Sequence, residues 1–267
     1  NQAVIDKMKE YNFVQTELFK FNTSDNVELN GWIMKPHNIQ ADKKYPVLIY
    51  VYGGPGSHSV KNSFDGFGNS WHQMLCQKGY IVACVDGRGT GARGTEFEKQ
   101  IYGNMGKLEL IDQIEGAKHL ASLPYVDKDR IGIWGWSFGG YMSALAITAG
   151  ADYFKTAVSV APVTNFRYYD NIYTERYLGL PKDNPSGYDD NSPISHADKL
   201  KGNLLIVHGS TDDNVHYQNT MEFANALIKA DKQFEMQIYP NRNHNIDDGN
   251  TRYHLFKRIT GYLLKNL

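Results

Sequence analysis

A serine at position 137 stands in a setting that is typical of a catalytic nucleophile. It occupies the centre of Gly135-Trp136-Ser137-Phe138-Gly139, which has the G-x-S-x-G form of a nucleophile elbow. The apolar run at 131–134 predicts a buried strand before it, and the run at 141–147 predicts a helix after it. At such a corner small residues let strand and helix pass closely, while the serine takes a strained backbone conformation. The alternative, a glycine-rich turn with an incidental serine, is disfavoured by the elements expected on both sides.

The serine needs two further side chains, because its hydroxyl is a poor nucleophile until an oriented base removes its proton. In chains with this elbow, an acid and then a histidine follow the serine in sequence. The acid is expected in the loop after a later strand, where both Asp212 and Asp213 are available. The base is expected in the polar loop between the last strand and the last helix, which contains His244. Other histidines either violate this order or are interpreted as structural, namely His37, His58, His72, His119, His208 and His216.

A tetrahedral intermediate on the serine also needs hydrogen-bond donors for its oxyanion. The backbone N–H of Phe138, the residue after the serine, is the first donor in this motif. The second is expected from the loop after the apolar run 47–52. There the sequence offers either backbone N–H groups of residues 53–56 or the phenol of Tyr52. Aromatic residues at strand ends more often belong to the core, so spacing alone gives the phenol little support.

Apolar runs that alternate with helical patterns predict the elements that carry these residues. Two alternating strands are expected at 14–21 and 27–34, followed by strands at 47–52, 80–85, 131–134, 156–160, 204–207 and 234–239. Helices are expected at 108–123, 217–230 and 253–267, and a lead-in segment at 1–13 has weak helical character. This alternation predicts an α/β fold, a mostly parallel sheet with helices on both faces. No internal repeat or low-complexity linker interrupts the chain, so we expect residues 1–267 to form a single domain.

Composition bounds the kind of protein. The chain has 267 residues, 41% of them hydrophobic, and a formal net charge of -1, which is enough material for one large α/β domain. The near-neutral charge argues against nucleic acid or an anionic membrane as an obligatory partner, and no apolar run approaches a membrane span. Cys76 and Cys84 are expected to be buried thiols, because no metal-ligand spacing surrounds them. The chain begins at Asn1 without a methionine, and we expect it to be a fragment of a longer protein.

One motif points to a different function. The segment 89–94 matches G-x-G-x-x-G directly after an expected strand, as in dinucleotide-binding folds. In those folds the third glycine lies in the first turn of a helix. Here the polar stretch 95–106 follows, and the clear helix begins only near Lys107. We therefore interpret 89–94 as a loop that crosses the top of the sheet, and we expect no nucleotide or other cofactor.

Several motifs together resemble the prolyl oligopeptidase family of serine peptidases, most closely its dipeptidyl peptidase branch. They are Tyr52-Gly53-Gly54-Pro55, Asp86-Gly87-Arg88-Gly89, the elbow extended to Gly140, Tyr173-Thr174-Glu175-Arg176-Tyr177 and the segment 208–216. The resemblance covers nearly the whole chain. It implies an α/β-hydrolase fold without a metal or other cofactor.

The resemblance also implies a role for each candidate residue. Ser137 is the nucleophile, Asp212 the acid and His244 the base. Tyr52 becomes the second oxyanion donor through its hydroxyl, beside the N–H of Phe138. Asn214 binds a substrate carbonyl, and a flat apolar pocket suits a proline ring; its residues are Val163, Phe166, Tyr169, Tyr173 and Val215.

The sequence supports this pocket modestly, because Tyr169, Tyr173 and Tyr177 recur at helical spacing and could share one face. Such a stripe also fits an ordinary core. Two positions depart from the family pattern: Phe138 and Phe166 stand where relatives commonly carry tyrosine and tryptophan.

The resemblance predicts a peptidase that releases X-Pro or X-Ala dipeptides from the N-terminus of a peptide with proline near that end. The alternatives are a less restricted oligopeptidase, acylaminoacyl peptidase or esterase, or a non-catalytic interaction protein on the same fold. Relatives carry a β-propeller before this domain, which supplies acids for the substrate's amino group, and we find no replacement for those acids in this chain. The resemblance also favours a homodimer and a periplasmic or extracytoplasmic location.

Overall fold

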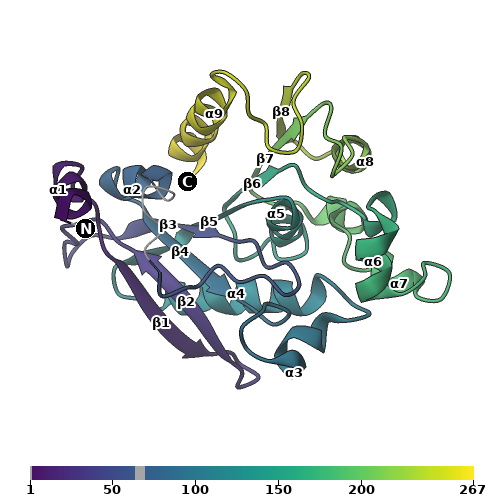
Figure 1. The fold of residues 1–267 in the computed structure, drawn as a ribbon, viewed down its shortest axis with the longest axis horizontal. Helices are drawn as coiled ribbons and strands as arrows, with labels where there is room; N and C mark the ends of the chain where they lie inside the picture. Colours follow the sequence, from purple (N-terminus) through teal and green to yellow (C-terminus); the bar gives the residue numbers. More distant parts are fainter. Residues whose placement is uncertain (1, 64–69) are drawn as a thin grey trace.

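Eight strands pair into one sheet in the order β1-β2-β4-β3-β5-β6-β7-β8 (Figure 1). The computed structural model describes residues 2–63 and 70–267. Bounds of the strands are β1 Thr16–Asn22, β2 Glu28–Met34, β3 Tyr45–Tyr50, β4 Ile81–Asp86, β5 Val126–Trp136, β6 Thr156–Val160, β7 Asn203–Gly209 and β8 Glu235–Tyr239. β1 and β2 run antiparallel to their neighbours, whereas β4, β3, β5, β6, β7 and β8 are parallel. The predicted mostly parallel sheet is confirmed.

The strand order reverses between β3 and β5. The chain passes from β3 to β4 on one side, then crosses back over β3 to form β5 and continues in the opposite direction. In open parallel sheets such a reversal leaves a crevice at the carboxyl ends of the strands, where ligands bind. Tyr52 follows β3 and Ser137 follows β5. The topology therefore brings both candidate residues to this switch point.

Helices cover both faces of the sheet (Figure 1). On one face α4, α5 and α8 bury side chains such as Leu120 and Phe223 in the same core as Ile49. On the other face α2 and α9 pack Leu75 and Ile259 against Leu48. The helices are α1 Gln2–Glu10, α2 Ser70–Gln77, α3 Thr95–Glu98, α4 Lys107–Ala121, α5 Phe138–Thr148, α6 Asn171–Leu178, α7 Pro185–Asp189, α8 Gln218–Lys229 and α9 Thr251–Asn266; 3-10 turns span Lys99–Ile101, Phe166–Tyr168 and Pro193–Lys199.

Most predicted elements are present, with three corrections. The strand expected at 47–52 ends at Tyr50, so Tyr52 lies beyond it. The strand expected at 131–134 runs from Val126 to Trp136, because Val126 pairs with Tyr45 across an irregularity in register. A one-turn helix, α3, follows Gly94 within the polar stretch 95–106, before the helix expected near Lys107, and its Phe97 is buried beside Leu29 and Val85.

Both cysteines are free and buried, as the sequence predicts. Cys76 lies on α2 and Cys84 on β4, and both belong to the core on the α2 and α9 face. Burial raises the pKa of the Cys76 thiol to about 12. These thiols are therefore held protonated and act as small apolar side chains.

Candidate active site

Ser137 is held in a strained turn between β5 and α5. Its φ is 61° and its ψ is -117°, and a positive φ is uncommon for a residue with a side chain. The turn is fixed from both sides, since the Ser137 N–H donates to the Val160 oxygen at 2.9 Å and its carbonyl accepts from Tyr141 N–H at 2.9 Å. Among the described residues, no hydrogen bond to the Ser137 hydroxyl is present. The predicted elbow is thus confirmed as a local structure, with a strained serine at its corner.

The glycines around this serine are required by close packing of the backbone. A Cβ on Gly135 would lie 2.3 Å from the Val51 oxygen, and one on Gly139 would lie 2.1 Å from the same atom. A Cβ on Gly140 would lie 2.5 Å from the Val160 oxygen. Gly135 and Gly139 let β5 and α5 pass against the chain that leaves β3, and Gly140 lets α5 approach the end of β6. Tyr52 is thereby brought close to the serine turn.

Asp212 and His244 form a hydrogen-bonded pair. The Nδ1 atom of His244 lies 2.7 Å from Oδ2 of Asp212. The other carboxylate oxygen, Oδ1, accepts from the backbone N–H groups of Asn214 at 3.0 Å and Val215 at 2.9 Å. Asp213, the alternative left open by the sequence, is exposed. Only Asp212 therefore contacts the histidine predicted as base.

Trp136 connects this pair to the serine turn. Its indole Nε1–H donates to the backbone oxygen of His244 at 2.9 Å. Trp136 is the last residue of β5 and directly precedes Ser137. The loop of His244 and the serine turn, more than a hundred positions apart in sequence, are thus side by side. Sequence reasoning did not assign a role to Trp136, although its position next to the serine was a usable signal.

Two groups are available as oxyanion donors. Phe138 is the first residue of α5, and the first N–H groups of a helix have no intrahelical acceptor. Tyr52 is half-buried, and its ring lies 6.3 Å from that of Phe138. Burial, and to a smaller extent the nearby Tyr177 phenol, raises the pKa of Tyr52. The Tyr52 hydroxyl therefore stays protonated at neutral pH and can donate.

The loop that carries Tyr52 is fixed to the glycine-rich segment 89–94. The Gly56 N–H donates to the Gly89 oxygen, and the Gly91 N–H donates to the Ser57 oxygen, both at 2.9 Å. A Cβ on Gly91 would lie 2.4 Å from the Gly56 oxygen. The carboxylate of Asp86 accepts the N–H groups of Ser59 and Val60. The segment that matches G-x-G-x-x-G therefore supports the loop after β3, and Gly91 is required there by the close approach of the Gly56 oxygen.

Asn214 has its amide oriented by Tyr169. The Tyr169 hydroxyl donates to the Asn214 Oδ1 atom at 2.9 Å. With its oxygen used as an acceptor, Asn214 keeps its NH₂ group for another acceptor. Asn214 is exposed and lies next but one to Asp212 along the chain. The arrangement suits the carbonyl-binding role that the resemblance implies.

The residues predicted for the apolar pocket belong to one hydrophobic cluster. Val163, Phe166 and Val215 are buried in it, and Tyr169 and Tyr173 pack against it. The Tyr169 and Tyr173 rings are 5.4 Å apart and nearly perpendicular. The tyrosine stripe is only partly helical, because α6 begins at Asn171 and Tyr169 precedes it in extended backbone. Phe138 and Phe166, the two departures from the family pattern, lie side by side with ring centroids 6.2 Å apart.

His208 was interpreted as purely structural, and the structure adds a contact to that interpretation. It is fully buried on β7, and its Nε2 lies 3.2 Å from Oδ2 of Asp212. Burial by itself raises the pKa of Asp212, and hydrogen bonds from His208 and then His244 more than offset it, so the pKa lies below its ordinary value. A buried polar residue at a strand end near the predicted acid was the available signal.

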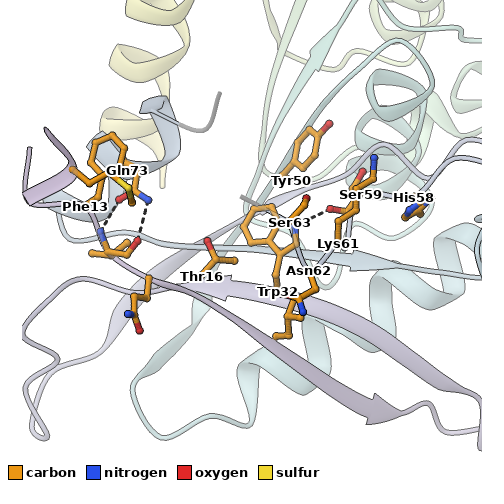
Figure 2. A pocket seen from close by; sticks show the side chains of 14 residues that line it. Phe13, Thr16, Trp32, Tyr50, His58, Ser59, Lys61, Asn62, Ser63 and Gln73 are labelled. Atoms are coloured by element: carbon orange, nitrogen blue, oxygen red, sulfur yellow. Dashed lines mark hydrogen bonds between the residues drawn. The ribbon is translucent and has the colours of Figure 1, made fainter. Parts of the chain in front are cut away.

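A separate cavity has a volume of about 530 Å³, and Figure 2 shows the side chains that line it. Its lining includes Phe13, Trp32, Tyr50 and Lys61, and no residue predicted for the active site. Gln73 closes one side, because both polar atoms of its amide form hydrogen bonds with the backbone of Val14.

Over residues 2–63 and 70–267, no group of three or more histidine, cysteine or acidic side chains is gathered as in a metal site. No helix in this part of the chain is long and apolar enough to cross a membrane.

Comparisons with known proteins point to one family. The model of the prolyl oligopeptidase family matches residues 67–267. The chain is 40% identical to a probable dipeptidyl-aminopeptidase B of Paracoccidioides brasiliensis, over 99% of the chain and 29% of that protein. It is 40% identical to the prolyl endopeptidase FAP of Mus musculus, over 85% of the chain and 30% of that protein.

A solved structure is also similar over nearly the whole chain. The dipeptidyl peptidase 4 of Porphyromonas gingivalis superposes with a TM-score of 0.95 and 48% identity, over 99% of this chain and 37% of that one. The chain therefore spans less than a third of the curated relatives' length and somewhat more than a third of the solved chain. The α/β-hydrolase fold that the resemblance implies is confirmed.

Proposed function

The chain belongs to the prolyl oligopeptidase family of serine peptidases, and from this premise we propose that it is the catalytic part of a dipeptidyl peptidase. The substrate is a peptide with proline or alanine as its second residue, and the product is an X-Pro or X-Ala dipeptide. Ser137, Asp212 and His244 carry the chemistry. Tyr52 and the N–H of Phe138 bind the oxyanion.

In the proposed mechanism, the Ser137 oxygen attacks the scissile carbonyl carbon while His244 takes the hydroxyl proton. The tetrahedral intermediate places its negative oxygen between Tyr52 and the Phe138 N–H. It collapses as the carbon–nitrogen bond breaks, and His244 gives its proton to the leaving amine. Water then attacks the acyl-enzyme by the same route and releases the dipeptide. Asp212 holds the Nδ1–H of His244, so that the other ring nitrogen faces the serine.

One observation carries this proposal: the 2.7 Å contact between Asp212 and His244, beside a serine with φ of 61°. A buried acid bonded to an imidazole orients it and stabilises its protonated form. Trp136 binds the backbone of that same histidine next to the serine turn. A non-catalytic protein on this fold would have no need for the pair or for the strained serine.

The proline preference is supported by the apolar cluster and by Asn214. Val163, Phe166 and Val215 are buried side chains without charge, which suits a ring that has no hydrogen-bond donor. Release of dipeptides also requires a negative partner for the substrate's ammonium group, because a buried cation without one is strongly disfavoured. We propose that residues outside this chain, in a preceding β-propeller, supply those carboxylates.

Labelling of the full-length protein with a fluorophosphonate tests the nucleophile. We expect Ser137→Ala to remove labelling and to lower kcat by roughly a millionfold. Ser143→Ala is the matched control: Ser143 lies on α5, the helix that follows Ser137, and its hydroxyl donates to the Gly139 oxygen at 2.8 Å. It should label normally. Labelling that persists in Ser137→Ala would exclude this assignment.

Specificity is tested with an unblocked X-Pro amide and its N-acetyl form. A dipeptidyl peptidase should have a much higher kcat/KM for the unblocked substrate. Efficient cleavage of the acetylated substrate would instead favour an endopeptidase or acylaminoacyl peptidase, and the similarity to a protein named prolyl endopeptidase keeps that as the second candidate. Labelling and specificity are separate readouts, so a wrong substrate does not affect the assignment of the nucleophile.

A further inference from the structure

A second histidine contacts the acid of the proposed catalytic pair. His208 lies on β7 with 0% of its surface exposed. Its Nε2 atom is 2.8 Å from the Val215 oxygen and 3.2 Å from the Asp212 Oδ2 atom. Its Nδ1 atom is 2.7 Å from the hydroxyl of Thr220 on α8. Every polar atom of this buried ring therefore has a partner.

These partners determine where the ring carries its hydrogen. A backbone carbonyl and a carboxylate can only accept, so the His208 Nε2 atom must be the donor. The Thr220 hydroxyl can donate, and it faces the Nδ1 atom, which is the acceptor in that tautomer. Thr220 is itself 0% exposed. Helix α8 thus supplies a hydroxyl that can donate to the Nδ1 acceptor of the Nε2–H form of His208.

The same contacts complete the surroundings of the Asp212 carboxylate. Oδ1 accepts two backbone N–H groups, from Asn214 and Val215. Oδ2 accepts Nδ1–H of His244 at 2.7 Å and faces Nε2 of His208 at 3.2 Å. With donors on both oxygens, the carboxylate cannot rotate without losing a bond. Hydrogen bonds to the charged form also stabilise it, in line with the lowered pKa of Asp212.

We propose that His208 is a positioning residue, which holds the Asp212 carboxylate in the orientation that its bond to His244 requires. Thr220 acts one step further out, because its hydroxyl gives the Nδ1 atom of His208 a partner in the tautomer that donates from Nε2. The inference rests on the proposed function, because it assigns a role only if Asp212 and His244 catalyse. His208 itself does not touch the substrate, the serine or the reacting atoms.

Other titratable groups near this network are few in the described parts of the chain. His244 faces Asp212 from the loop after β8, and the Tyr169 phenol lies near enough for the Asp212 charge to raise the pKa of Tyr169, after burial as the main cause. The ring of Tyr217, at the start of α8, lies 5.8 Å from His208. With its pKa raised above the ordinary value, the Tyr169 phenol does not change charge near neutral pH. A change in the pH profile between pH 5 and 8 therefore does not come from the Tyr169 phenol.

Two substitutions of His208 separate positioning from packing. In His208→Gln the amide nitrogen can occupy the place of Nε2 and keep a donor toward Asp212. In His208→Asn the shorter amide reaches only the place of Nδ1, so the donor toward Asp212 is lost. We expect His208→Asn to lower kcat roughly ten- to a hundredfold with KM little changed. In His208→Asn the acidic limb of the kcat/KM profile should move to higher pH by about half a unit or more. His208→Gln should restore most of the kcat and most of the parental position of that limb.

Further variants keep the test valid if His208→Asn does not fold. Thr220→Val keeps the shape of the side chain and removes the hydroxyl, and we expect a smaller effect in the same direction. His72→Phe alters another buried histidine, which packs against Trp32, Tyr50, Trp71 and Trp134. The pH profile of its kcat/KM should match that of the parent. Thermal unfolding identifies variants that do not fold; if His208→Asn is among them, Thr220→Val decides.

Two outcomes would overturn the inference. One is equal kcat and equal pH profiles for folded His208→Asn and His208→Gln. The other, where His208→Asn does not fold, is a parental kcat and pH profile for Thr220→Val. Failure of the proposed function itself would be distinct, because the parent protein would then not react with a fluorophosphonate at Ser137.

Discussion

The indole nitrogen of Trp136 donates a 2.9 Å hydrogen bond to the backbone oxygen of His244. The residue before the proposed nucleophile therefore holds the loop of the proposed base. This bond joins the end of β5 to the segment between β8 and α9. The bond therefore fixes the loop of His244 against the turn that carries Ser137.

Trp136→Phe should accordingly weaken catalysis without unfolding the protein. The ring remains, but the bond to His244 is lost, and a displacement of a catalytic group by an ångström can cost about a hundredfold. We expect kcat to fall roughly tenfold or more, with a smaller change in KM, in steady-state kinetics on an X-Pro amide. Arg252→Ala is the control, because the guanidinium lies over the Trp136 ring, 4.8 Å from its centroid, without touching that bond. If the two variants behave alike, the indole hydrogen bond does not position His244.

Tyr52→Phe should lower kcat far more than it changes KM. A phenol that donates to the oxyanion acts on charge that develops only in the transition state. Its loss should cost about 3 kcal/mol, or roughly a hundredfold in kcat. Tyr169→Phe is the matched control, since it also removes one phenol but frees the Asn214 amide instead, and it should act mainly on KM. A parental kcat in Tyr52→Phe would return Tyr52 to an ordinary packing role.

His72 should make the protein less stable in mild acid. It is buried among the rings of Trp32, Tyr50, Trp71 and Trp134, and burial lowers its pKa from 6.5 to about 4. Between these values the unfolded chain binds a proton that the folded protein excludes, so stability falls as the pH drops below 6.5 and the loss levels off near 4. The full effect is about 3 kcal/mol.

His72→Phe should remove this part of the pH dependence, because phenylalanine binds no proton. Free energies of unfolding measured by denaturant at pH 7, 6, 5 and 4 test the prediction. Plotted against pH, the free energies of unfolding of parent and variant should run parallel above pH 7. Below pH 7 that of the parent should fall more steeply. Parallel curves throughout would show that His72 does not titrate in this way.

Glu109 should make the protein less stable as the pH rises, which is the opposite of the effect of His72. Its Oε2 accepts the Gly106 N–H at 2.9 Å, its Oε1 is buried without a described partner, and burial raises its pKa to about 8. Between pH 4.5 and 8 the unfolded chain releases a proton that the folded protein keeps, so stability falls as the pH rises. Glu109→Gln should remove a slope of up to about 1.4 kcal/mol per pH unit. An unchanged slope between pH 5 and 8 in unfolding experiments would contradict this.

Several features could be predicted from the sequence because they depend on local chemistry. Gly135, Ser137 and Gly139 predict the elbow, since only small neighbours permit a serine at positive φ between a strand and a helix. Apolar periodicity predicts the strands and main helices, because each must bury one face or both. The same pattern predicts a mostly parallel sheet. Chain order then places the candidate acid and base in the loops around 212 and 244.

Other features depended on which segments meet in space, and only the tertiary structure decided them. Asp212 and Asp213 are neighbours of the same type, and they differ because one is buried against His244 and the other faces solvent. The contacts of Trp136 with His244, of Tyr169 with Asn214 and of Thr220 with His208 join residues distant in sequence. A hydrogen bond requires its two atoms to come within about 3 Å with correct alignment. Periodicity specifies which face a side chain takes, whereas that distance is set by the packing of the whole sheet and its helices.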